Sequence, residues 1–163
     1  AETPDPRHRE HQGTHRGRPR VNFVLDASVT MRWFFLDGKP AERTYALSVL
    51  DAMKQSKTSA LVPVTWALEI SDVIGKAENK GLITEAQSEA FLEMLGSIDI
   101  RVDTATFSKA LSDTLQISRR HRLSAYDASY LELAMREGLP LATLDQGLQK
   151  AANKAGLKRL VVK

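Results

Sequence analysis

The chain has 163 residues, of which 42% are hydrophobic and 26% are charged, and it contains no cysteine. This composition is typical of one globular domain, and it excludes a disulfide scaffold, a thiolate zinc site, an iron–sulfur cluster and a cysteine nucleophile. The net charge of +3 alone is too small to identify a nucleic-acid-binding protein. The chain has no run apolar enough to span a membrane and no apolar segment of the secretory type near residue 1, so we expect a cytoplasmic protein without a membrane partner.

Residues 1–20 differ in composition from the rest of the chain. They carry five arginines, three acidic residues, three prolines and three of the four histidines, and their one aliphatic side chain is Ala1. Such a segment cannot bury enough apolar surface to offset the entropy cost of ordering it. We therefore expect a disordered basic tail or an added leader over 1–20 and a folded domain over 21–163.

From residue 21 onward, short apolar runs alternate with helical periodicities. In chain order, the first half of the pattern predicts a strand at 21–26, helices at 27–35 and 41–57, a strand at 59–64, a helix ending at Gly81, and a helix opened by a capping box at Thr84. The second half predicts a strand at 98–102, helices at 104–122 and from Ser124 to Gly138, a strand at 140–144, a helix at 145–155, and a last strand at 158–163. This alternation predicts an α/β fold with three layers (α/β/α) around a central, mostly parallel sheet.

Two acidic residues follow predicted strands. Asp26 ends the strand at 21–26, and Asp145 follows the strand at 140–144. Parallel strands place ligands beyond their carboxyl ends, so these two side chains are expected at the same edge of the sheet. An aspartate between a strand and a helix is also a good helix N-cap, and this alternative stays open for each residue.

Two further acidic residues lie at or beside apolar helix faces. Asp127 falls near the centre of the stripe formed by Tyr130, Leu131 and Ala134, where an unpaired carboxylate would cost several kcal/mol. The alternative is an acid in the first helical turn that reaches solvent. Glu69 lies at the edge of its helix stripe, where a solvated side chain is the ordinary interpretation.

Together the four acids suggest one cation site. Four carboxylates without histidine or cysteine suit the hard cations Mg²⁺ and Mn²⁺. Divalent cations attract phosphate, lower the pKa of bound water and stabilise in-line displacement at phosphorus. The substrate class that fits is a phosphate ester.

Four segments resemble the PIN-domain family, and most closely its VapC-type toxins. They are VNFVLDAS (21–28), WALEISDVI around Glu69, SAYDASYLELA (124–134) and LATLDQGLQKAANKAG (141–156). The resemblance implies a Mg²⁺- or Mn²⁺-dependent endoribonuclease that leaves a 5′-phosphate and a 3′-hydroxyl. It also implies a toxin of a type II toxin–antitoxin pair, a homodimer, a small antitoxin as partner, and operator DNA bound only through that antitoxin.

The resemblance also implies roles for particular residues. Asp26, Glu69, Asp127 and Asp145 would be the catalytic and metal-binding quartet, and Ser28 and Thr143 resemble small hydroxyls that line the pocket. For these two hydroxyls, an N-cap and a strand-end residue are the alternatives. Candidate contacts to the RNA backbone are Lys109, Arg119, Arg120 and Arg122.

Three other functions stay open. A haloacid-type phosphatase needs a second aspartate two residues after Asp26, where this chain has Ser28. A receiver domain needs adjacent acids, but Ala27 follows Asp26. A non-catalytic binding module could use the same acidic pocket for a basic partner.

Overall fold

The computed structural model describes residues 21–55 and 58–162, so the predicted tail over 1–20 lies outside the described residues. One parallel sheet has the strand order β3-β2-β1-β4. Its strands are β1 (Val21–Leu25), β2 (Ser59–Val62), β3 (Ile100–Val102) and β4 (Leu141–Ala142). The predicted α/β class with a parallel sheet is confirmed.

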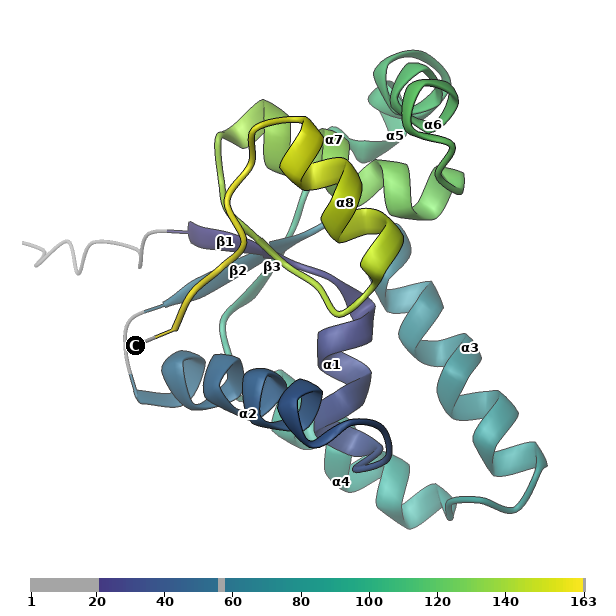
Figure 1. The fold of residues 1–163 in the computed structure, drawn as a ribbon. Coiled ribbons are helices and arrows are strands. Elements are labelled where there is room, and N and C mark those ends of the chain that lie inside the picture. The colour runs from purple at the N-terminus through teal and green to yellow at the C-terminus, as the bar shows by residue number, and fades with distance from the viewer. Residues whose placement is uncertain (1–20, 56–57, 163) are drawn as a thin grey trace, which may run out of the picture.

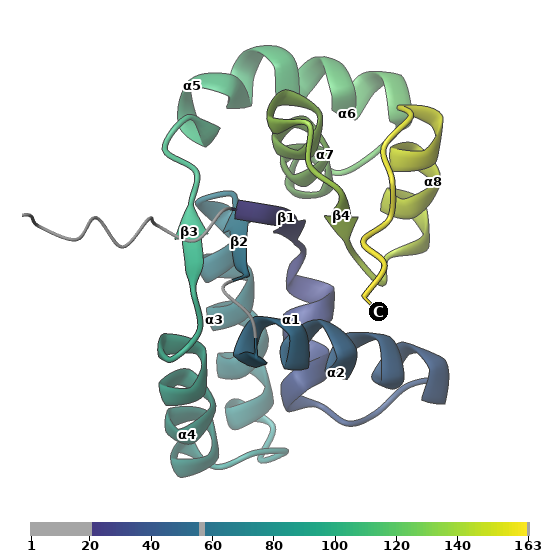
Figure 2. The same ribbon diagram turned by 90° about the vertical axis from the view of Figure 1, so that its left-hand side faces the viewer.

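Helices cover both faces of the sheet and complete the three layers. In Figures 1 and 2, α1, α2 and α4 lie on one side of the strands, and α5 to α8 lie on the other. The helical elements are α1 (Ala27–Phe34), α2 (Pro40–Gln55), α3 (Thr65–Asn79), α4 (Glu85–Gly96), α5 (Thr106–Lys109), the π-helical turn η1 (Ala110–Thr114), α6 (Leu115–His121), α7 (Ala125–Glu137) and α8 (Gln146–Lys154). None of the helices in the described ranges is long and apolar enough to cross a membrane.

The centre of the core is β1, which has a strand on each side and helices above and below. Phe23, Val24 and Leu25 are buried almost completely, as are Leu131 and Leu133 of α7. A continuous apolar run, without alternation, is what a strand covered on both faces requires. The apolar run before Asp26 therefore places that residue at the middle of the sheet.

Three predicted elements are wrong in extent. The helix at 104–122 is divided into α5, η1 and α6, because a π-helical turn with i→i+5 geometry interrupts the α-helical ladder. The strand at 140–144 is reduced to Leu141–Ala142, because beyond it the Leu144 N–H donates to the Ser28 hydroxyl and the Thr143 carbonyl accepts from Gln149. The last strand is wrong over its described part, where the two-residue β4 offers one parallel bridge, from Leu141 to Arg159.

The parallel arrangement brings the carboxyl ends of the strands to one edge. Asp26 follows β1, Asp103 follows β3, and Thr143 follows β4, while β2 leads into α3, which carries Glu69. Ser124 caps α7 as predicted, so Asp127 lies in its first turn. The fold thus places the four predicted acids on elements that begin at this edge.

Candidate functional site

Asp26 is held by two hydroxyl groups. It occupies the N-cap position of α1, yet its side chain makes no capping hydrogen bond and is 4% exposed. The Oδ2 atom instead accepts hydrogen bonds from Ser28 Oγ (2.5 Å) and Thr143 Oγ1 (2.6 Å). Burial raises the pKa of the Asp26 carboxyl, the two hydroxyls oppose that rise, and the charge of Asp127 adds to it.

The β4–α8 loop orients these hydroxyls. The backbone N–H of Leu144 donates to Ser28 Oγ, and the N–H of Asp145 donates to Thr143 Oγ1, each over 3.0 Å. Because each hydroxyl oxygen already accepts a backbone N–H, its own proton is directed to Asp26. Ser28 and Thr143 are therefore placed to hold the Asp26 side chain in one orientation as a hydrogen-bond acceptor.

Glu69 lies on α3 and contacts α7. Its Oε1 atom accepts a hydrogen bond from the hydroxyl of the fully buried Tyr130 (2.9 Å). Burial raises the pKa of Glu69 to about 7; the Tyr130 hydrogen bond lowers it, and the charges of Asp26 and Asp127 raise it further. Burial and the charges of Asp26 and Glu69 also raise the pKa of Tyr130. Glu69, Asp26 and Asp127 thus lie close enough to repel one another.

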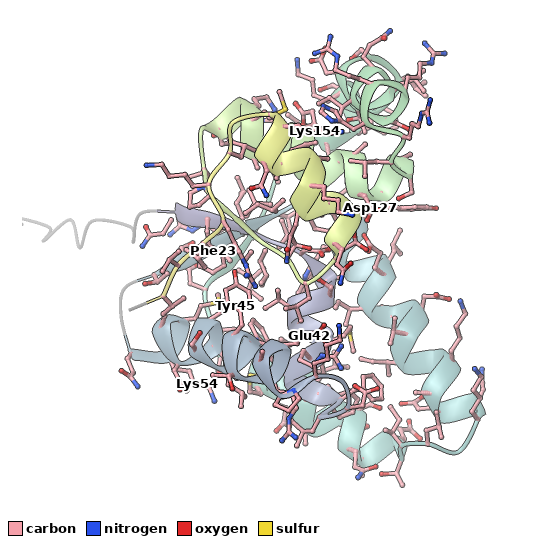
Figure 3. All side chains as sticks on the ribbon, in the orientation of Figure 1. Phe23, Glu42, Tyr45, Lys54, Asp127 and Lys154 are labelled. Carbon is pink, nitrogen blue, oxygen red and sulfur yellow. The ribbon has the colours of Figure 1, made fainter. Side chains whose placement is uncertain are left out.

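Asp127 is half-buried in the first turn of α7, close to the start of α3 (Figure 3). Ser124 Oγ donates to its Oδ2 atom (2.7 Å) and accepts its backbone N–H (3.0 Å). The carboxylate is therefore neither deep in the apolar stripe nor free in solvent. It lies at the rim of a cleft of about 580 Å³ that Glu69 also lines.

Asp145 is placed differently from the other three acids. It is exposed, and its Oδ1 atom accepts the Leu148 N–H over 2.7 Å, so that it caps α8. The capping interpretation therefore describes its side chain. Only its backbone N–H, which donates to Thr143, connects it to the Asp26 network.

Two other buried acids differ from the acids of the candidate site, because each of them pairs with an arginine. The buried Asp103 and Glu132 both pair with Arg136, each over 2.8 Å. Within residues 21–55 and 58–162, no lysine or arginine forms such a pair with Asp26, Glu69 or Asp127. Glu69 and Asp127 line the cleft together with Asp72, which pairs with Lys76. The negative charge of Asp26, Glu69 and Asp127 is therefore left without such a pair, which is the environment that a cation stabilises.

The donor chemistry fits a hard divalent cation, because Asp26, Glu69 and Asp127 offer only carboxylate oxygens. Across the described parts of the chain, however, no three acidic or histidine side chains converge into a complete ligand set. Each carboxylate accepts a hydrogen bond from a neighbouring hydroxyl instead. The structure thus gives the donor type and the charge of a cation site, without a closed coordination sphere.

The predicted RNA-contacting cations lie on the helices that lead into α7. Lys109 pairs with Asp113 (2.8 Å), whereas Arg119, Arg120 and Arg122 are exposed and form no ion pair among the described residues. Arg122 adopts a left-handed conformation (φ 54°), the one positive φ of a non-glycine residue in the described ranges. This turn directs the chain toward Ser124, so the arginines come close to Asp127 in sequence.

Tyr130 is a site residue that the sequence prediction missed. It was placed only in the apolar stripe of α7, where its ring indeed packs. A tyrosine in a buried stripe needs a hydrogen-bond partner for its hydroxyl, and that requirement was the available signal.

Comparisons with known proteins match most of the chain to one family. A family model for the PIN domain matches residues 23–154. Ribonuclease VapC3 of Mycobacterium tuberculosis (strain H37Rv) is 32% identical over 133 residues, which are 82% of this chain and 89% of that protein. Ribonuclease VapC3 of Pyrobaculum aerophilum is 29% identical over 82 residues, and this match spans 50% of the chain and 63% of the relative.

A solved structure shares the fold. The crystal structure of PAE2754 from Pyrobaculum aerophilum is similar with a TM-score of 0.56 and 21% sequence identity, covering 80% of this chain and 86% of that one. At this identity the similarity concerns the fold alone.

Proposed function

Since this chain belongs to the VapC-type PIN-domain family, we propose that it is a Mg²⁺- or Mn²⁺-dependent endoribonuclease and the toxin of a type II toxin–antitoxin pair. The observation that carries the proposal is a group of three acids, Asp26, Glu69 and Asp127, whose charges act on one another and which form no ion pair with a described lysine or arginine. The relatives named Ribonuclease VapC3 support the choice of RNA as substrate.

Asp26, Glu69 and Asp127 would hold the cation, with Asp145 at the rim. When bound, the cation supplies a nucleophile from water at neutral pH and stabilises negative charge at phosphorus. Ser28 and Thr143 hold the Asp26 side chain in one orientation, and Tyr130 fixes the side chain of Glu69.

The proposal extends to partners. Arg119, Arg120 and Arg122 provide exposed positive charge for RNA phosphates beside the cleft, and Lys109 adds to it once released from Asp113. We assign to the protein a small antitoxin, a homodimeric state, operator DNA bound through that antitoxin, and a cytoplasmic location, where the RNA substrate is found.

The test compares cleavage of mixed cellular RNA by the wild type, Asp26→Asn and Asp127→Asn in the presence of Mg²⁺ or Mn²⁺. Both variants should lose cleavage while circular dichroism shows an unchanged fold. Asp51→Asn is the matched control, because Asp51 is an exposed aspartate on α2. A wild-type protein that cleaves no RNA with either metal would refute the nuclease assignment and favour the binding module.

The toxin assignment has its own test. Induced expression should arrest bacterial growth, and coexpression of the open reading frame just upstream should restore it. Growth arrest that persists in the Asp26→Asn variant would show that the arrest does not come from this site.

A further inference from the structure

Two exposed apolar side chains flank the acids of the cleft. Leu68 is 69% exposed and Tyr126 is 59% exposed, and each directly precedes a cleft acid, Glu69 or Asp127. Both line the cleft of about 580 Å³ together with those acids. Large apolar side chains exposed together at a charged cleft are typical of a ligand-binding surface.

The two side chains lie on rigidly connected helical turns. The Ser129 hydroxyl donates to the Tyr126 carbonyl (2.6 Å) and lies 3.5 Å from Thr65 Oγ1 of α3. The hydrogen bond from Tyr130 to Glu69 forms a second connection between α7 and α3. The separation of Leu68 from Tyr126 is therefore set by the fold, and the surface is preformed.

The cleft combines three chemistries that one ligand must satisfy. It is lined by an aromatic and an aliphatic side chain and by acids suited to a cation, and the exposed Arg119, Arg120 and Arg122 closely precede its residue Ser124 in the chain. A flat apolar ring attached to a phosphodiester meets all three requirements, because the ring stacks on tyrosine while the phosphates face the cation and the arginines. A base within a duplex cannot offer its face to the ring, so the base has to be unstacked.

We propose that Tyr126 and Leu68 form a platform that binds one unstacked base of the RNA substrate beside the phosphodiester to be cleaved. This inference rests on the proposed function and adds to it the two residues that position a base of the substrate. Stacking of a base on an aromatic side chain corresponds to about 5- to 100-fold in affinity.

The experiment measures binding of a fluorescein-labelled single-stranded RNA by anisotropy, with Mn²⁺, in the cleavage-deficient Asp26→Asn protein. Tyr126→Ala should weaken binding by about 5- to 100-fold, whereas Tyr126→Phe, which keeps the ring, should bind as the parent does. Phe107→Ala is the matched control, because Phe107 is 88% exposed on α5 and does not line the cleft. Leu68→Ser provides a second variant should Tyr126→Ala fail to fold.

Steady-state cleavage by otherwise wild-type protein gives the second readout. Tyr126→Ala should raise KM for single-stranded RNA while kcat changes little, and duplex RNA should remain a poor substrate. If the wild type cleaves RNA but Tyr126→Ala leaves affinity and KM unchanged, the platform is refuted and the nuclease assignment stands. If Tyr126→Ala changes the oligomeric mass by light scattering without changing KM, the surface is an interface between copies, and the platform is likewise refuted. A wild type without RNA cleavage refutes the proposed function itself.

Discussion

The stability of this protein should respond differently to the loss of charge at two kinds of buried acid. Asp103 is 8% exposed and pairs with Arg136. Asp26 is 4% exposed, but its Oδ2 atom is bonded by two neutral hydroxyls. We expect Asp103→Asn to destabilise the protein and Asp26→Asn to leave its stability unchanged or to raise it.

The magnitude follows from the surroundings of each acid. Removal of one partner from a buried ion pair costs about 3–5 kcal/mol. Arg136 is 23% exposed and keeps Glu132 as a partner, so we expect Asp103→Asn to lower the free energy of unfolding by about 1–3 kcal/mol. Asp26→Asn removes a charge that burial and Asp127 already disfavour, so its cost should stay below about 0.5 kcal/mol.

The assay is urea unfolding followed by circular dichroism at pH 8 without added metal. Asp51→Asn, an exposed change on α2, provides the baseline for a neutral substitution. A loss of stability in Asp26→Asn equal to that in Asp103→Asn would refute the reasoning, because Asp26 would then be an acid that the fold itself requires.

Three further predictions concern the cleft. Glu69→Gln should be more stable than the wild type above pH 7 and equal to it near pH 4. The pKa of Glu69 is about 7 in the folded protein against an ordinary 4.5, so between these values the folded protein keeps a proton that the unfolded chain releases. The wild type therefore loses stability as pH rises through this window. Urea midpoints at both pH values test this, and a difference independent of pH would contradict it. Thr143→Val keeps the side-chain shape but removes the hydroxyl that lies between Asp26 and the Asp145 N–H. The rate of cleavage of a fluorogenic RNA should therefore fall by about tenfold or more, and an unchanged kcat would contradict this role. Asp145→Asn should leave the melting temperature unchanged, since asparagine caps helices as well as aspartate does. Asp145→Ala should lower the free energy of unfolding by about 1 kcal/mol. If both variants have the same melting temperature in a thermal melt, the capping role is excluded.

Much of the fold was predictable because the strands are short apolar runs between well-marked helix ends. Ser124 and Thr84 cap their helices as predicted, and Gly138 ends α7 with a positive φ of 64°. The division of 104–122 was not predictable from periodicity, because a π-helical turn leaves helix-forming residues on both sides. The loss of the last strand depends on the short β4, which is shortened by side-chain hydrogen bonds from distant residues.

At the candidate site, burial and sequence position did not predict which acids have a cationic partner. Asp103 follows a strand and Glu132 lies in the buried face of α7, so both meet the criteria that selected Asp26 and Asp127. Arg136 neutralises both, yet it lies 33 residues from Asp103 along the chain. Sequence position can suggest that an acid is buried, but only the folded arrangement shows whether a cation accompanies it.

The hydroxyl network around Asp26 also affects the order in which the protein can mature. Thr143 and Asp26 are separated by 117 positions, and β1 pairs with β4 through Val24 and Leu141. A ribosome therefore synthesises Asp26 early, while its partner Thr143, which follows the neighbouring strand β4, is added only after more than a hundred further residues. A nascent chain that stops before residue 141 lacks both β4 and this hydroxyl, so the pocket can be completed only late in translation.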